Sequence, residues 1–146
     1  MFLWAALFLY IIFTVAAKRV IKIGYINYNP NPKHARVGDC AVRCIAKATG
    51  ADWQDAYIQL AIQGYVMRNL PSADIVWGEY LKLKGFHREA IPEEKSGDYT
   101  VRDFCADNPT GTYVVKTDGH VVCVVDGDYY DSWDSGEETP LYYWRR

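Results

Sequence analysis

The chain has 146 residues, a formal net charge of −2 and a hydrophobic fraction of 50%. This length fits one compact domain that can bury a substantial core. Lysine and arginine are scattered rather than gathered in one stripe, so we expect no nucleic acid among the partners. The aromatic residues, 15% of the chain, then indicate a β-rich core rather than a base-stacking platform.

The first 19 residues form an apolar leader that differs from the remainder, residues 20–146. Phe2 and Ala17 bound a run without any charge, and Lys18 and Arg19 follow it directly. The run is shorter than the roughly 20 residues that usually span a bilayer. We therefore expect a marginal membrane anchor, whose positive flank would keep the following domain in the cytoplasm.

Two alternatives to a membrane anchor remain open for this leader. Val15, Ala16 and Ala17 satisfy the small-residue rule for signal cleavage, which would make the protein secreted, although no positive residue precedes the apolar run. The leader could also be an extension outside the functional fold of a cytoplasmic protein.

The next segment predicts a short strand followed by a loop. Residues 20–28 alternate, with Ile21, Ile23 and Tyr25 on one side. The sequence Asn-Pro-Asn-Pro at residues 29–32 ends the alternation, because proline lacks the N–H that regular pairing needs.

Cys40 begins a predicted helix over residues 40–49. Asp39 is suited to the N-cap and Gly50 to the stop. In the first turn, free backbone N–H groups and the helix dipole favour a thiolate. The adjacent Asp39 carboxylate disfavours that thiolate unless capping takes up its charge.

Three further helices are predicted, all as scaffolding. Asp52 caps the first, with Asp55 in its opening turn and Gly64 at its end, and its inward face comprises Trp53, Ala56, Tyr57 and Leu60. The second covers about residues 72–84 and is closed by Gly85. Thr100 with Asp103 caps the third, which Pro109 terminates.

From Gly111 onward the pattern changes to β. Residues 112–116 and 120–125 predict a hairpin, because Asp118 and Gly119 are a strong turn signal. After a turn at Asp126 and Gly127, residues 129–133 are predicted to form the next strand, and residues 141–144 can form a last one. The prediction is an α+β fold, with helices first and an antiparallel sheet last.

The four cysteines are Cys40, Cys44, Cys105 and Cys123, which could in principle form two disulfides or, with His120, a zinc site. Residues three apart on a strand point to opposite faces, so His120 and Cys123 should not converge on a metal. We expect no metal and no other cofactor. The ordinary role of Cys44, Cys105 and Cys123 would be buried apolar filling.

Cys40, His120 and Asp131 occur in the order of a nucleophile, a base and an orienting group. A thiol needs such help, because near neutral pH it is mostly protonated. Each residue also has an ordinary structural interpretation. Cys40 could be a core cysteine, His120 a strand-edge histidine and Asp131 a solvated turn residue. The combination favours catalysis, with Asp128 and Asp134 as alternatives for the orienting role.

These motifs resemble the papain-like cysteine peptidases. Gly-Asp-Cys at a helix start, Gly-His at a strand start and Asp-Ser-Trp on the next strand follow that family's chain order, with Asp131 where the family has asparagine. Together with Asn-Pro-Asn-Pro and Gly-Thr-Tyr, they also resemble small papain-like proteins of phage and bacterial genomes. The resemblance covers about residues 25–144 and leaves out the apolar leader.

The resemblance implies that Cys40 attacks an acyl carbon, His120 transfers the proton and Asp131 fixes the imidazole tautomer. The family's oxyanion glutamine is absent, so the implied oxyanion donors are the Cys40 backbone N–H with Asn31 or His34. Trp133 would be a lid over the imidazole and the carboxylate.

The expected function is hydrolysis of a peptide, isopeptide or amide bond in a peptide or protein substrate. One alternative is an inactive papain-like binding or inhibitory module of phage origin. Another is acyl transfer to an amine, as in transglutaminases, which share the triad.

Overall fold

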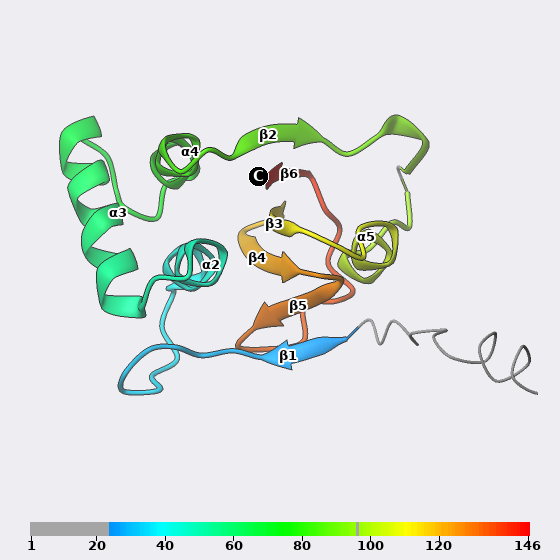
Figure 1. Cartoon of the computed structure of the whole chain (residues 1–146), viewed down its shortest axis with the longest axis horizontal. Coiled ribbons are helices and arrows are strands. Elements are labelled where there is room, and N and C mark those ends of the chain that lie inside the picture. Colours follow the sequence, from blue (N-terminus) through cyan, green and yellow to red (C-terminus); the bar gives the residue numbers. More distant parts are fainter. Residues whose placement is uncertain (1–23, 96) are drawn as a thin grey trace, which may run out of the picture.

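The computed structural model describes residues 24–95 and 97–146 and has α+β architecture, as predicted (Figure 1). The elements in chain order are β1 Tyr25–Asn27, α2 Cys40–Thr49, α3 Trp53–Met67, α4 Asp74–Leu83, β2 His87–Ala90, a 3-10 turn Glu93–Lys95, α5 Val101–Asp107, β3 Thr112–Thr117, β4 His120–Val125, β5 Asp128–Asp131 and β6 Tyr142–Arg145. Within this part of the chain, no helix has the length and apolar character needed to cross a membrane. The apolar leader, with its predicted anchor or signal, lies outside the described residues.

The strands form a mixed sheet in the order β1-β5-β4-β3-β6-β2. β1 runs parallel to β5, whereas the other neighbouring pairs are antiparallel. The prediction of a purely antiparallel sheet built after the helices was therefore wrong in two respects. β1 finds its partner about 100 residues away, and β2, with the polar sequence His-Arg-Glu-Ala, carries no apolar alternation and joins as an edge strand beside β6.

Helices cover both faces of the sheet (Figure 1). α2 packs on β4, and α3 and α4 lie beside α2. Their apolar side chains form one core with Val114, Val121, Cys123 and Trp144 of the sheet. α5 covers the opposite face and forms a second core with Val115, Val122, Val124 and Tyr129. The alternation of β3 and β4 between the two cores is what fixes their register.

The predicted limits of α2 are confirmed. Cys40 is its first residue, and Gly50 ends it in the left-handed conformation, with φ of +74°. Asp39 occupies the N-cap, but its side chain makes no capping hydrogen bond. Its carboxylate is engaged elsewhere, in the candidate site.

The prediction for α3 was partly wrong. Asp52 caps the helix by accepting from the Asp55 N–H at 2.8 Å, as expected. However, the helix continues past Gly64 to Met67. Gly64 does not end the helix; its missing side chain lets the loop that follows the helix pass close to it. A Cβ there would lie 2.7 Å from the Asn69 carbonyl oxygen of the following loop. Tyr57, predicted to face inward, is exposed.

The remaining local signals are confirmed. Gly85 has a φ of +84° just after α4. Thr100 and Asp103 form a complete capping box at the start of α5. Asp118 and Gly119 connect β3 to β4, with Thr117 paired to His120 across the turn.

Candidate active site

The structure brings Cys40, His120 and Asp131 together. His120 Nε2 lies 2.5 Å from Asp131 Oδ2. The same ring is hydrogen-bonded to the Cys40 thiol, and because Nε2 is occupied by the carboxylate, the nitrogen available to the sulfur is Nδ1. The imidazole thus connects a half-buried thiol to a buried carboxylate.

The fold explains why residues so distant in sequence meet. α2 packs on β4, which places the first residue of the helix beside the first residue of the strand. β5 runs antiparallel to β4, so its last residue, Asp131, returns to the end of the sheet where β4 begins. The parallel strand β1 secures that end, because the Tyr28 N–H donates to the Asp131 carbonyl oxygen at 2.7 Å.

The surroundings of Cys40 favour its thiolate. Burial alone would raise the pKa of this thiol, but the hydrogen bond and positive charge of His120, a backbone bond from Val121 and the charge of Arg43 together lower it. The other cysteines are different. Burial raises the pKa of Cys105 and of Cys123 to about 12, and it raises the pKa of Cys44 well above the ordinary thiol value.

The pKa values of His120 and Asp131 are shifted in opposite directions. Burial would lower the pKa of His120, yet its hydrogen bonds to Asp131 and Cys40 and their negative charges raise it to about 9. Burial would raise the pKa of Asp131, but its hydrogen bonds from His120 and Ser135 lower it. These shifts favour a thiolate on Cys40, an imidazolium on His120 and a carboxylate on Asp131.

Asp131 is the carboxylate that contacts the His120 ring, and only 1% of its surface is exposed. Besides the imidazole, it accepts from the Ser132 backbone N–H at 2.8 Å and from Arg43 at 3.2 Å. The two alternatives lie elsewhere. Asp134 pairs with Arg102, and Asp128 accepts from the Gly24 N–H at 3.0 Å.

Arg43 is a site residue that the sequence analysis missed. It is buried and forms ion pairs with both Asp39 and Asp131. Asp39 also accepts from the Trp53 indole N–H at 2.8 Å. The charge of Asp39 is therefore met by Arg43 and not by helix capping. The i,i+4 spacing of Asp39 and Arg43 on one helix was the available signal.

Ser135 is a second missed residue, and it predicts a measurable stability effect. Its buried hydroxyl donates to Asp131 Oδ2 at 2.6 Å. We expect Ser135→Ala to lower the free energy of unfolding by about 1.5 to 3 kcal/mol in urea titrations at pH 7, because it removes a donor to a buried charge. With one donor fewer, the pKa of Asp131 moves back toward its unfolded value, so acidification removes less stability through this group, and that loss is complete at a higher pH.

Ser132→Ala is the matched control for that measurement. Ser132 holds the same carboxylate through its backbone N–H, which an alanine keeps. Equal effects of the two substitutions would show that the Ser135 hydroxyl does not support Asp131.

Two cavities open at the thiol. The larger, of about 420 Å³, is lined by Arg36, Val37, Gly38, Cys40, Arg43, Gly119, His120, Ser132 and Trp133. A smaller one of about 120 Å³ lies on the side of Ser72, Trp77 and Lys116. Cys40 and His120 therefore line both cavities.

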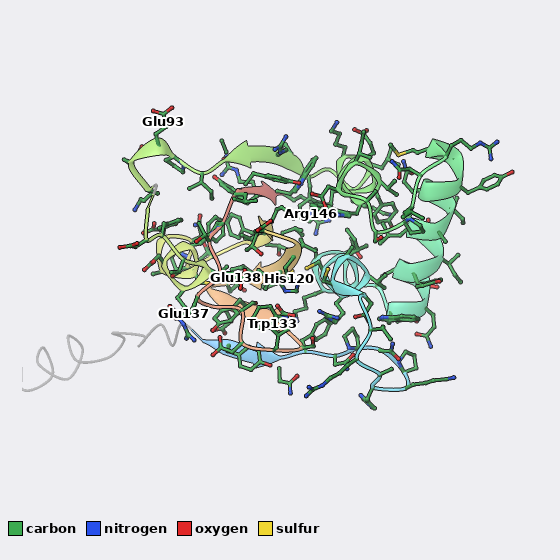
Figure 2. The ribbon with its side chains drawn as sticks, turned by 180° about the vertical axis from the view of Figure 1, so that it is seen from behind. Glu93, His120, Trp133, Glu137, Glu138 and Arg146 are labelled. Atoms are coloured by element: carbon green, nitrogen blue, oxygen red, sulfur yellow. The ribbon has the colours of Figure 1, made fainter. Side chains whose placement is uncertain are left out.

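Trp133 covers the His120 ring only in part. Its ring centroid lies 5.1 Å from that of His120, with the planes inclined at 44°. Figure 2 shows both side chains at the end of the sheet nearest α2. Trp133 is 45% exposed, so one face packs on the imidazole while the other meets solvent.

The structure does not place the two predicted oxyanion residues at the thiol cavities. Asn31 is buried in its loop, where its side-chain oxygen accepts from the Lys33 N–H at 2.9 Å, and it lines a different, apolar pocket. His34 is exposed, with a φ of 51°. Arg36, which the sequence analysis did not single out, lines the larger thiol cavity instead.

The cysteines form no cross-link. Cys40, Cys44, Cys105 and Cys123 are all free thiols, and the last three are buried, as expected of apolar filling. Within residues 24–95 and 97–146, no three histidine, cysteine or acidic side chains gather in an arrangement that could hold a metal ion.

Comparison with known proteins gives no match to a family model, to a curated protein or to a solved structure. The chemistry of the site therefore has to be argued from its own geometry.

Proposed function

We propose that this chain is a cysteine-dependent hydrolase that cleaves a peptide, isopeptide or amide bond through a thioester intermediate. The observation that carries the proposal is the position of His120, which bonds to the Cys40 thiol on one side and to the buried Asp131 carboxylate on the other. Such an arrangement activates a sulfur nucleophile and supplies a proton donor in one step. The start of α2 adds the helix dipole to the stabilisation of the thiolate.

The reaction follows from the charge state of the three groups. The Cys40 thiolate attacks the carbonyl carbon, and the imidazolium of His120 gives its Nδ1 proton to the departing amine. The C–N bond breaks and a thioester with Sγ remains. His120, now neutral, takes a proton from water, which attacks the thioester and releases the acid and the thiolate. Asp131 holds the ring in orientation and stabilises its positive charge throughout.

The proposal extends to membership of the papain-like group. Support comes from the chain order of nucleophile, base and orienting residue and from the place of each at a helix start, a strand start and a strand end. Trp133, two residues after Asp131, packs on the catalytic ring in keeping with this assignment.

The oxyanion would be stabilised by the Cys40 backbone N–H and a second donor. Arg36 lines the larger thiol cavity, whereas Asn31 and His34 line neither thiol cavity, so Arg36 is the better candidate for that donor. Loss of one such donor typically costs about 2.7 to 4 kcal/mol of transition-state stabilisation.

The test of the proposal is selective alkylation together with cleavage. We expect iodoacetamide at pH 6.5 to modify Cys40 at least about tenfold faster than Cys44, Cys105 or Cys123, as measured by peptide mapping in a mass spectrometer. We also expect the full chain to cleave members of a fluorogenic peptide library, and Cys40→Ser to abolish that cleavage.

The competing functions give different results in the same assays. An inactive binding module would show no cleavage and a Cys40 no more reactive than a thiol in a small peptide. An acyl transferase would form cross-linked or amine-exchanged products when a primary amine is added, which mass analysis separates from hydrolysis.

A further inference from the structure

Lys116 is a buried cation that the reaction described above does not use. It belongs to β3 and faces the core beneath α2, because Val114, two residues earlier on the same face of the strand, is part of that core. Only 9% of its surface is exposed. Burying an ammonium group is costly unless partners satisfy it, so a lysine at an inward position of an interior strand requires an explanation.

The contacts of Lys116 match its charge only in part. Its Nζ donates to the Thr117 carbonyl oxygen at 2.6 Å, and within residues 24–95 and 97–146 this is the one hydrogen bond that the ammonium makes. Asp74 Oδ2 lies farther away, at 3.7 Å, and the Asp74 side chain is 54% exposed, so solvent weakens this ion pair. An ammonium group has three N–H donors, and the remaining ones are available to a ligand.

Lys116 lines the smaller thiol cavity, together with Cys40 and His120. The volume of this cavity, about 120 Å³, equals that of about four water molecules in the liquid. Such a space suits a short polar side chain, of the size of a carboxymethyl or carboxyethyl group. A carboxylate held at the ammonium would therefore lie beside the reacting sulfur.

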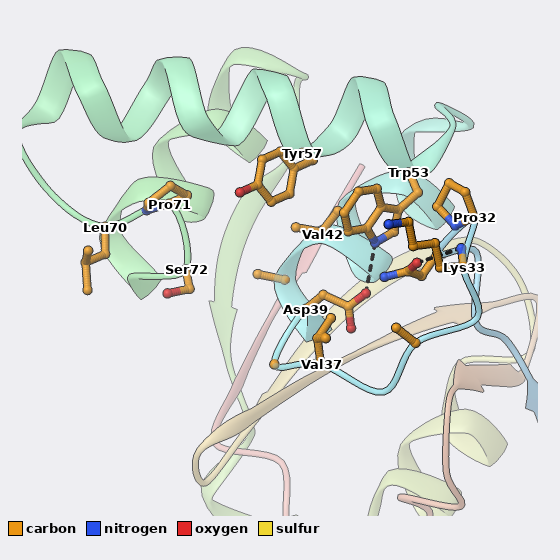
Figure 3. Close-up of a pocket in the computed structure, with 14 residues that line it drawn as sticks. Pro32, Lys33, Val37, Asp39, Val42, Trp53, Tyr57, Leu70, Pro71 and Ser72 are labelled. Atoms are coloured by element: carbon orange, nitrogen blue, oxygen red, sulfur yellow. Dashed lines mark hydrogen bonds between the residues drawn. The ribbon is translucent and has the colours of Figure 1, made fainter.

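The neighbouring cavities have no comparable cation in the described part of the chain. Arg43, in the larger thiol cavity, is already paired with Asp39 and Asp131. Arg36 of the same cavity is exposed to solvent. The apolar pocket drawn in Figure 3, which shares Ser72 with the smaller thiol cavity, is lined by no buried lysine or arginine. The smaller thiol cavity is thus the place where a buried positive charge remains open to an anion.

We propose that Lys116 selects substrates that carry a carboxylate next to the scissile bond. The carboxylate enters the smaller thiol cavity and accepts from the ammonium, while Cys40 attacks the adjoining carbonyl carbon. This inference rests on the proposed hydrolase function and names its substrate class. Lys116 acts as a specificity-determining residue and takes no part in the proton transfers.

The first test is direct binding to the full chain that carries Cys40→Ala. The probes are N-acetyl-glutamate α-amide and N-acetyl-glutaminamide, which have the same shape and differ in the charge of the side chain. The indole N–H resonance of Trp77, which also lines the cavity, reports binding. We expect the glutamate probe to bind at least about tenfold more tightly than the glutamine probe, and Lys116→Met to remove this preference, because a hydrogen bond between two charged groups is lost.

Asp74→Asn should give a change of the opposite sign. The Asp74 carboxylate competes with the substrate for the Lys116 ammonium, so its neutralisation should tighten binding of the glutamate probe by about two- to fivefold, as expected for a partly exposed ion pair. A lysine with a purely structural role would give no such gain.

Lys82→Met is the matched control for both variants. Lys82 lies on α4, its side chain is 56% exposed and paired with Glu79, and it lines neither thiol cavity. Its replacement should leave the affinities of both probes unchanged.

A cleavage assay with the unmodified chain identifies the source of the carboxylate. Fluorogenic peptides with glutamate or glutamine at each position beside the scissile bond test a side-chain carboxylate. Peptides that end one residue after the bond, in a free carboxylate or in an amide, test the carboxylate of a chain end. A preference for the charged member of either set that Lys116→Met removes would support the proposal.

The carboxylate site and the hydrolase fail in different ways. Binding of the glutamate probe that depends on Lys116, with no cleavage and a Cys40 of ordinary reactivity, would support the site and refute the hydrolase. Cleavage that Cys40→Ser abolishes, with equal rates for charged and uncharged peptides or with a preference that persists in Lys116→Met, would overturn the site and leave the hydrolase standing. Equal affinities of the two probes in Cys40→Ala would likewise overturn the site.

Discussion

Replacement of His120 by alanine is expected to slow alkylation of Cys40 at pH 6 on the order of 100-fold. An ordinary thiol with a pKa near 8.5 is ionised in only about one molecule in 300 at that pH. Without the hydrogen bond and charge of His120, burial acts on Cys40 with less opposition and its pKa rises. The loss is smaller than the change in ionisation, because a thiolate of higher pKa is intrinsically more nucleophilic. The measurement is the rate of iodoacetamide modification across pH 5 to 10.

The pH dependence of cleavage by the unmodified chain should reflect the pKa shifts of both Cys40 and His120. Cleavage should rise as Cys40 ionises below the usual thiol range and fall as His120 loses its proton near pH 9, which gives a bell shape.

Because the folded-state pKa of His120 lies above its unfolded value of about 6.5, its contribution to stability is complete below that pH. That contribution is lost as the pH rises to about 9, and His120→Ala should remove this slope.

His87→Ala is the control for the His120 measurement. His87 is an exposed histidine at the β2 edge, paired with Glu89 and remote from the thiol cavities. An alkylation profile in His120→Ala that coincides with those of His87→Ala and the unmodified chain would contradict the assignment of His120 as the base.

Replacement of Arg43 by methionine is expected to lower the free energy of unfolding by about 3 to 5 kcal/mol. Methionine replaces the unbranched hydrocarbon part of the arginine side chain but has no charge, so the buried carboxylates of Asp39 and Asp131 lose their shared cation. Removing one partner of a buried ion pair typically costs about 3 to 5 kcal/mol. Urea titration at pH 7 measures it. Asp39→Asn added to Arg43→Met should regain part of the loss, because it removes one of the two uncompensated charges.

The chain offers a matched control for Arg43. Arg102 also joins two carboxylates, those of Asp134 and Glu137, but its side chain is 43% exposed. Exposed ion pairs contribute between about 0 and 1 kcal/mol, so Arg102→Met should have a small effect. Comparable losses for the two variants would show that the Arg43 network is not a buried charge cluster of the kind described.

Local signals were sufficient for much of the fold and for the choice of the three side chains that meet at the candidate site. Asp39 and Gly50 mark the limits of α2, and Asp118 with Gly119 marks the hairpin, because caps and turns are determined by a few neighbouring residues. Once α2 and β4 are placed, Cys40 and His120 each stand at the start of an element.

Non-local contacts could not be read from the sequence in the same way. The partner of β1 lies about 100 residues away, and β2 has no alternation to reveal it. Arg43 lies within the helix predicted over residues 40–49, and only the tertiary structure places Asp131 opposite it. The hydroxyl of Ser135 and the exposure of Tyr57 depend likewise on which loop or helix lies beside them.

The separation of the site residues along the sequence has a consequence for its synthesis. Cys40 is translated before its two partners, because His120 and Asp131 follow it by 80 and 91 residues. A nascent chain that ends before β4 carries a sulfur with neither its imidazole nor its carboxylate. The surroundings that lower the pKa of Cys40 are therefore acquired only after β4 and β5 have been synthesised, so a chain terminated before β4 carries an ordinary thiol.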